Sequence, residues 1–170
     1  MKKVLMVIAP HDFRDEEYQQ PFEEFKKAGF KVSTVSTVLG EVIGMLGGTV
    51  ISEGLLNGTS ALEYDAVVFI GGAGASMYFD NAEAHKLAVE ASEQNRLLGA
   101  ICIAPVILAN AGLLKGRKAT VWKDQKLIGI LKEKGAEYTG ADVVKDGKII
   151  TAAGPFAARE FGKAVVKALI

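Results

Sequence analysis

The sequence of 170 residues has few of the residue types that build metal centres and covalent cross-links. Its only cysteine is Cys102, and its only histidines are His11 and His85. One cysteine excludes an internal disulfide and a multi-cysteine zinc site, so we expect a cytoplasmic, reducing compartment and no metal. No apolar run reaches the roughly 18 residues that cross a bilayer.

An excess of one charge is also missing. Lysine and arginine together number 20, and so do aspartate and glutamate, which gives a net charge of zero. No basic cluster with interleaved aromatic residues occurs. Such a balance excludes broad electrostatic binding, so we expect neither nucleic acid nor a membrane as a partner. The length predicts a single domain over residues 1–170.

Short apolar runs alternate with helical patterns, which predicts an α/β fold around a mostly parallel sheet. Strands are predicted at residues 3–9, 31–36, 66–70, 97–101 and 118–121. Helices are predicted at 15–28, 82–95, 104–111, 124–134 and 156–168. The glycine-rich stretch 37–60 is predicted to be a hairpin or small excursion. Residues 142–152 form a predicted hairpin that turns at Asp146-Gly147.

Ligands of open parallel sheets bind at the carboxyl ends of the strands. Segments 11–17, 71–75, 102–105 and 121–124 are therefore the candidates for a functional rim. In residues 99–105 the chain passes directly from strand to helix, with small residues on both sides of Cys102. This pattern predicts a nucleophile elbow at a helix N-terminus, which would lower the thiol pKa. The alternative is a buried cysteine that acts as a small hydrophobe.

Two further features accompany the cysteine. Gly71-Gly72 follows a buried strand but is no dinucleotide fingerprint, because Met77 stands where the final glycine belongs. Its amides can form an oxyanion hole with the amide of Ile103, or the loop is a plain turn. Glu17 either complements the helix dipole, as Asp15 and Glu16 do in the same first turn, or faces the sulfur with a raised pKa and shares its proton.

The residues resemble the ThiJ/PfpI superfamily, and most of all its deglycase branch, over almost the whole chain. The motifs are Glu17 with Pro21 and Lys27-Ala28-Gly29, Gly71-Gly72, residues 100–105, residues 145–151, Gly154-Pro155 and Glu160-Phe161. The resemblance implies a flavodoxin-like three-layer sandwich with helices on both faces, a homodimer or larger homo-oligomer, and no cofactor. It also implies a Cys102 nucleophile, a protonated Glu17, and oxyanion amides at Gly72 and Ile103.

The chain departs from the family where a histidine is expected. Ile103 directly follows the cysteine, and Trp122 stands at the end of the following strand. We expect Trp122 to form a pocket wall or an interface. His11 is a hypothetical acid/base group at the rim, or else a loop histidine, and His85 receives no role.

The resemblance, together with these departures from it, implies three candidate functions. The first is slow glyoxalase- or deglycase-like chemistry on methylglyoxal-type aldehydes or glycated substrates, through Cys102. The alternative is a non-catalytic redox sensor or chaperone that acts through Cys102 oxidation. The third is a PfpI-type intracellular peptidase, which lacks the Cys–His pair that such chemistry requires.

Overall fold

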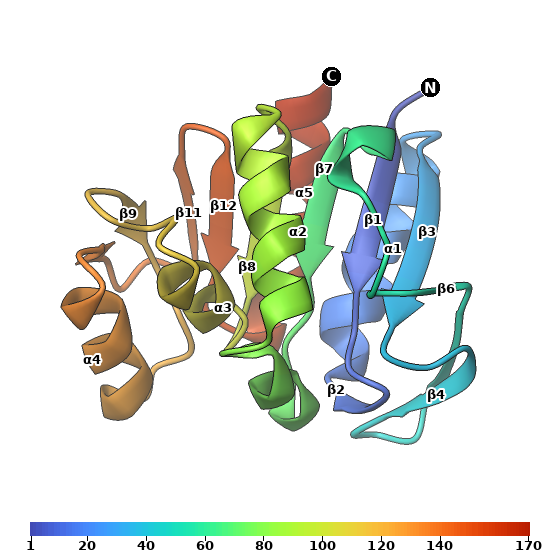
Figure 1. The fold of residues 1–170 in the computed structure, drawn as a ribbon, viewed down its shortest axis with the longest axis horizontal. Coiled ribbons are helices and arrows are strands. Elements are labelled where there is room, and N and C mark those ends of the chain that lie inside the picture. The colour runs from blue at the N-terminus through green and yellow to red at the C-terminus, as the bar shows by residue number, and fades with distance from the viewer.

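A seven-stranded sheet runs through the computed structural model, which describes residues 1–170 (Figure 1). Its strands are β1 Lys3–Val7, β3 Lys31–Ser36, β6 Gly54–Leu55, β7 Ala66–Phe69, β8 Leu97–Ile101, β11 Val143–Asp146 and β12 Ile149–Ala152. The order is β11-β12-β8-β7-β1-β3-β6, and only the β11–β12 pair is antiparallel. The predicted mostly parallel α/β sheet is confirmed.

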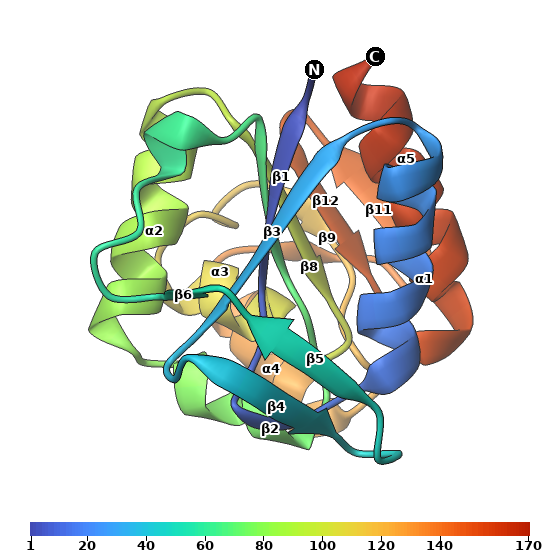
Figure 2. The ribbon, with the colours of Figure 1, turned by 90° about the vertical axis from the view of Figure 1, so that its right-hand side faces the viewer.

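Helices cover both faces of this sheet, as the flavodoxin-like resemblance implied (Figure 2). Helices α1 Asp15–Lys27 and α5 Ala158–Leu169 lie on one face, and α2 Ala82–Glu93 and α3 Pro105–Asn110 lie on the other. Alternation along β1 serves both faces, since Leu5 and Val7 join one core while Val4 and Met6 join the other. Helix α4 Gln125–Glu133 packs against α3 beyond the sheet.

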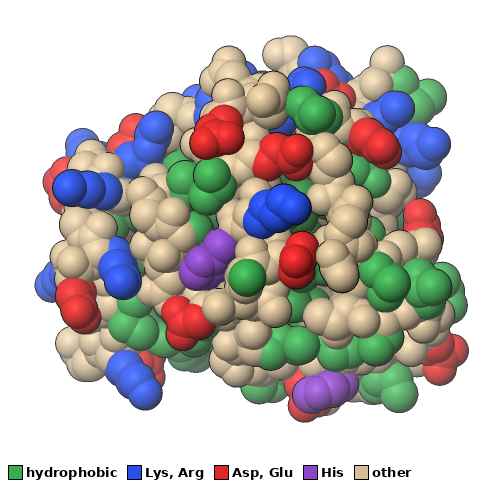
Figure 3. All heavy atoms as spheres, viewed as in Figure 1, with side chains coloured by type: hydrophobic (Ala, Val, Ile, Leu, Met, Phe, Trp, Pro, Cys, Tyr) green, Lys and Arg blue, Asp and Glu red, His purple; other side chains and the backbone are tan.

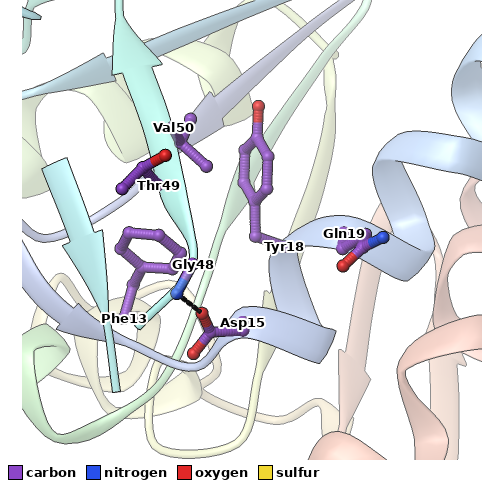
Figure 4. A pocket seen from close by; sticks show the side chains of 7 residues that line it. All are labelled: Phe13, Asp15, Tyr18, Gln19, Gly48, Thr49 and Val50. Carbon is purple, nitrogen blue, oxygen red and sulfur yellow. Dashed lines mark hydrogen bonds between the residues drawn. The ribbon is translucent and has the colours of Figure 1, made fainter. Parts of the chain in front are cut away.

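The glycine-rich stretch forms the predicted excursion. Strands β4 Gly40–Gly44 and β5 Thr49–Ser52 make an antiparallel hairpin, and β2 His11–Phe13 pairs with β4. The Asp15 carboxylate accepts a hydrogen bond from the amide of Leu46 at 2.7 Å. It accepts another from the amide of Gly48 at 2.9 Å, which Figure 4 shows. This acid at the start of α1 therefore ties the hairpin to the helix that carries Glu17.

Several boundaries differ from the predictions. Strand β9 is only Lys118–Ala119 and pairs with the unpredicted β10 Glu137–Tyr138 outside the main sheet. Residues Ala73–Tyr78 and Pro155–Ala157 form 3₁₀ turns, so α5 begins at Ala158. The β11–β12 turn is one residue later than predicted, because Asp146 still pairs with Ile149. None of these shifts moves the carboxyl ends of the central strands.

Candidate active site

Cys102 occupies a strained turn between β8 and α3. Its φ angle is +65°, a left-handed conformation that non-glycine residues rarely adopt. Its amide donates to the carbonyl of Ala152 at 2.9 Å, and its carbonyl accepts from the amide of Trp122 at 2.8 Å. These two bonds hold the turn from both neighbouring segments. The residue keeps 8% of its surface exposed, so the sulfur lies at the edge of the interior.

Glu17 enters the same site from the first turns of α1. It is fully buried, and neither carboxyl oxygen has a hydrogen-bond partner of standard geometry. Gly71 separates it from the cysteine: a β-carbon at Gly71 would lie 2.5 Å from Glu17 Oε1 and 2.6 Å from Cys102 Cβ. Only glycine permits this approach, which explains the residue type at position 71.

The backbone amides of Gly72 and Ile103 also lie near the sulfur. Gly72 has a φ angle of +99°, and a side chain there would collide with the backbone at Phe13 and Arg14. Both amides are close enough to Cys102 to lower its pKa. Two fixed N–H donors beside a nucleophile have the arrangement of an oxyanion hole.

Burial dominates the ionisation of both side chains. It raises the pKa of Glu17 to about 8, although the Cys102 side chain and the charge of Arg14 lower it. Burial raises the pKa of the Cys102 thiol, and the charge of Glu17 raises it further. The amides of Gly72 and Ile103 act in the opposite direction, but they lower the thiol pKa by less than burial and the charge of Glu17 raise it. The expectation that the turn lowers the thiol pKa is therefore wrong.

The pair is therefore a neutral acid facing a protonated thiol near pH 7. Because the carboxyl proton is lost only near pH 8, the charge of Glu17 opposes thiolate formation mainly above that pH. Below it, the carboxyl can donate a hydrogen bond to sulfur. The site is thus arranged for proton exchange between the two groups rather than for a permanent thiolate.

Beside this pair lies a cavity of about 240 Å³. It is lined by Arg14, Glu17, Met45, Gly72, Ala73, Cys102, Ile103, Trp122 and Pro155. All four segments predicted for the rim contribute to it, and they bring Cys102, Glu17, Gly72, Ile103 and Trp122 together. Gly71 lies directly behind the lining, between the acid and the cysteine.

Four lining residues were not predicted as site residues from the sequence, namely Arg14, Met45, Ala73 and Pro155. Arg14 precedes α1, and its Nε donates to Glu16 Oε2 at 2.9 Å. Met45 comes from the β4–β5 turn, and its sulfur accepts the Ala73 amide at 3.4 Å. Pro155 follows β12. Only one of these residues could have been suspected from the sequence: Arg14 stands two residues before Glu16, and such a charged pair is a candidate ion pair.

His11 does not reach the cavity. Its side chain is 71% exposed, and its Nδ1 lies 3.3 Å from Asp12 Oδ2. The pairing of β2 with β4 directs the imidazole to solvent, away from Glu17. His85 lies on α2, where its Nε2 contacts the carbonyl of Phe79 at 2.7 Å. No imidazole therefore lines the cavity of Cys102.

Known proteins share the sequence pattern of this chain over almost its whole length. The DJ-1/PfpI family profile matches residues 2–168. An uncharacterised protein of Methanocaldococcus jannaschii is 46% identical over 168 residues, covering 98% of this chain and 82% of that protein. A protein of Thermococcus kodakarensis named a deglycase is 30% identical over 151 residues, covering 89% and 90%.

Solved structures of similar proteins share the fold of this chain. A ThiJ/PfpI domain protein from Brachyspira murdochii has a TM-score of 0.94 at 32% identity, covering 98% of this chain and 95% of that one. DJ-1beta of Drosophila melanogaster has a TM-score of 0.89 at 26% identity, covering 99% and 90%. No helix has the length and apolar character to cross a membrane. The chain belongs to the DJ-1/PfpI family.

Proposed function

We propose that this chain is a cysteine-dependent enzyme of carbonyl stress, acting on methylglyoxal-type aldehydes or their glycated adducts. The observation that carries the proposal is the strained Cys102 and the buried, unpartnered carboxyl of Glu17 in one cavity. The names of relatives support the same class: the Thermococcus protein and an Escherichia coli relative, 28% identical, are called deglycases. A cytoplasmic location fits a thiol that must stay reduced.

In the first step, sulfur of Cys102 adds to the aldehyde carbon of the α-oxoaldehyde. One carboxyl oxygen of Glu17 takes the thiol proton while the other gives its proton to the aldehyde oxygen. The amides of Gly72 and Ile103 stabilise the developing negative charge. The product is a hemithioacetal, and Glu17 is neutral again, so no net charge is left in the buried site.

In the next steps, Glu17 moves a hydrogen from the former aldehyde carbon to the neighbouring carbon. It takes the C–H proton and gives its own to the ketone oxygen, which forms an enediol. Transfer of a proton to the second carbon then gives a thioester. Water adds to the thioester carbon, the carbon–sulfur bond breaks, and the thiol and a 2-hydroxy acid are released. Methylglyoxal gives lactate by this route.

We expect this turnover to be slow. The raised pKa of Cys102 keeps the thiolate fraction small, and no imidazole lines the cavity to act as a base. A peptidase would need such a base for an amide leaving group, so peptidase activity is the third candidate.

Lactate formation from methylglyoxal tests the proposal. Wild type should form lactate, while Cys102→Ser, purified in parallel, should remain at the rate of the buffer. Equal rates for wild type and Cys102→Ser would contradict the proposal, because the sulfur would then take no part. The parallel purification also reports any contaminating glyoxalase.

A second candidate function is redox sensing, favoured by the unpartnered carboxyl oxygens of Glu17. Each hydrogen peroxide would deliver one oxygen to the Cys102 sulfur and leave as water, giving a sulfinic acid after two additions. A protonated Glu17 and the amides of Gly72 and Ile103 would hold its oxygens. Mass spectrometry should then find oxidation halting at two oxygens in wild type but not in Glu17→Gln. Identical profiles for the two proteins would count against this function.

We also propose that the chain forms a homodimer or larger homo-oligomer through its hairpin. Exposed apolar side chains gather around β4, β5 and β6, at the lower right of Figure 3. Ile43 and Ile51 are 51% and 59% exposed on the outer face of the β4–β5 hairpin. Sedimentation velocity should show an oligomer for wild type and a smaller species for Ile43→Glu. A monomeric wild type would contradict the assembly.

A further inference from the structure

The cavity of Cys102 has an apolar wall that the proposed chemistry leaves without a task. Trp122 forms this wall together with Met45, Ile103 and Pro155. Trp122 is 40% exposed, which leaves much of a large aromatic surface in contact with water. Removing such surface from water is favourable, so the wall is suited to an apolar group of a ligand.

The position of Trp122 relative to the sulfur is fixed by short contacts. Its amide donates to the Cys102 carbonyl at 2.8 Å, and its carbonyl accepts from the Asp124 amide at 2.7 Å. Its ring packs against the Gly154 backbone, where a β-carbon would lie 2.8 Å from the ring atom Cε3. Phe156 borders it with ring centroids 6.5 Å apart. A ligand bound covalently to Cys102 therefore meets the indole at a defined place.

Charge in the cavity does not favour an anionic ligand. Its one basic side chain, Arg14, is engaged by the Glu16 carboxylate at 2.9 Å. Its acid, Glu17, becomes negative near pH 8 and would repel a second carboxylate. The volume of about 240 Å³ exceeds the roughly 150 Å³ at which an apolar cavity binds benzene. A phenyl-sized group therefore fits beside the reacting carbonyl.

From these contacts we propose that Trp122 is a specificity-determining residue that selects α-oxoaldehydes with an aryl or bulky alkyl substituent. The substituent packs on the indole while the aldehyde carbon faces Cys102. The inference rests on the proposed function for the reaction itself. It goes further by naming the substrate class, with phenylglyoxal favoured over methylglyoxal, and methylglyoxal over the anionic glyoxylate.

Binding can be measured without any reaction, because Trp122 is the only tryptophan of the chain. Its fluorescence is titrated in Cys102→Ser with acetophenone, which carries the phenyl group but no aldehyde. Acetone and benzoate serve as the small and the anionic controls, and free N-acetyltryptophanamide corrects for absorbance. Acetophenone should change the emission saturably, with an apparent Kd at least tenfold below those of acetone and benzoate.

Activity gives the second measurement. The ratio of kcat/KM for phenylglyoxal to that for methylglyoxal is compared in wild type, Trp122→Ala and Trp122→Phe, with folding checked by circular dichroism. Trp122→Ala should reduce the ratio about tenfold or more, and Trp122→Phe should restore most of it. Dividing by the kcat/KM for methylglyoxal removes general effects of the substitution on Cys102 and Glu17.

The outcomes separate the two proposals. Saturable acetophenone binding with no turnover in any protein would contradict the enzymatic function and leave Trp122 as an apolar binding wall. Turnover with an unchanged ratio in Trp122→Ala, or acetophenone binding no tighter than acetone, would overturn the inference. The fluorescence titration needs no change at Trp122, so it decides the matter even if Trp122→Ala does not fold.

Discussion

Glu17 and Trp122 line the same cavity, yet their surroundings are opposite. Glu17 is fully buried on a helix that packs against the sheet, with two carboxyl oxygens that lack partners. Trp122 is 40% exposed and follows a short strand outside the main sheet. In the proposed reaction the buried acid transfers protons, and its surroundings leave the side chain little space to move. The exposed indole can bury apolar surface against a ligand, but it takes no part in proton transfer. The two proposals therefore place the reaction and the selection of the substrate on different elements.

The largest expected effect is on the reaction rate, and it comes from removing the acid. Glu17→Gln keeps the shape of the side chain but cannot exchange a proton with the thiol and the substrate. We expect lactate formation from methylglyoxal to fall by about 10²–10⁴-fold, the usual contribution of general acid–base catalysis. Initial rates measured at pH 7 check this. Glu133→Gln, on the exposed side of α4, is a matched control that should keep the wild-type rate.

The same variant separates proton transfer from sulfur reactivity. Above pH 8 the charge of Glu17 opposes thiolate formation, and the neutral amide of the Glu17→Gln variant carries no such charge. Iodoacetamide should therefore alkylate Cys102 several-fold faster in Glu17→Gln than in wild type at pH 9, although turnover is lost. Slower alkylation of the variant at pH 9 would mean that the carboxylate assists the sulfur instead of opposing it.

Stability gives the next largest effect. The pKa of Glu17 rises from its ordinary value of 4.5 to about 8 on folding, so the folded chain binds more protons than the unfolded chain between these values. Stability should consequently fall as the pH rises from about 4.5 to about 8. Glu17→Gln removes this fall, so the stability of the variant relative to wild type should rise by about 4 kcal/mol between pH 4.5 and pH 8. Urea unfolding at pH 5 and pH 8 tests the sign, and a constant difference between the proteins would contradict it.

A smaller effect on stability is expected at Asp15. This residue links the helix that carries Glu17 to the turn that carries Met45. Asp15→Ala removes the acceptor for the amides of Leu46 and Gly48, so the turn that carries Met45 should loosen. We expect a loss of about 1–3 kcal/mol in the free energy of unfolding. Hydrogen exchange should speed up at Leu46 and Gly48 while amides in β7 stay protected. Unchanged exchange at the turn would show that the hairpin is held without this carboxylate.

The parts of the site that were predicted from the sequence are local. The passage from strand to helix around Cys102 and the glycines after β7 lie within a few residues of the strand ends, and small residues indicate tight turns. The prediction of Glu17 as a site residue required only that the first helix begins near the end of β1. These signals depend on neighbours in the chain, which a single sequence displays.

What was missed depends on contacts between distant segments. Met45 lies in the hairpin turn and Pro155 follows the last strand, and an apolar residue in a loop has no distinguishing pattern. Asp15 looked like an ordinary first-turn acid because its partners come about thirty residues later. The direction of the Cys102 pKa shift was wrong for the same reason. The sequence indicates a turn but not how deeply the surrounding elements bury the sulfur.

The smallest expected effect tests the indole without removing it. In Gly154→Ala the added methyl group would lie 2.8 Å from Trp122 Cε3 and 2.9 Å from Phe156 Cε1, so the rings must shift. We expect the preference for phenylglyoxal over methylglyoxal to fall about threefold, a cost of roughly 0.7 kcal/mol. The Trp122 emission maximum should shift as its environment changes. Gly140→Ala is the control, because a methyl group there meets nothing within 4 Å. If both variants keep the wild-type preference, contact with Gly154 does not set the position of the wall, and the backbone bond from Trp122 to Cys102 alone fixes it.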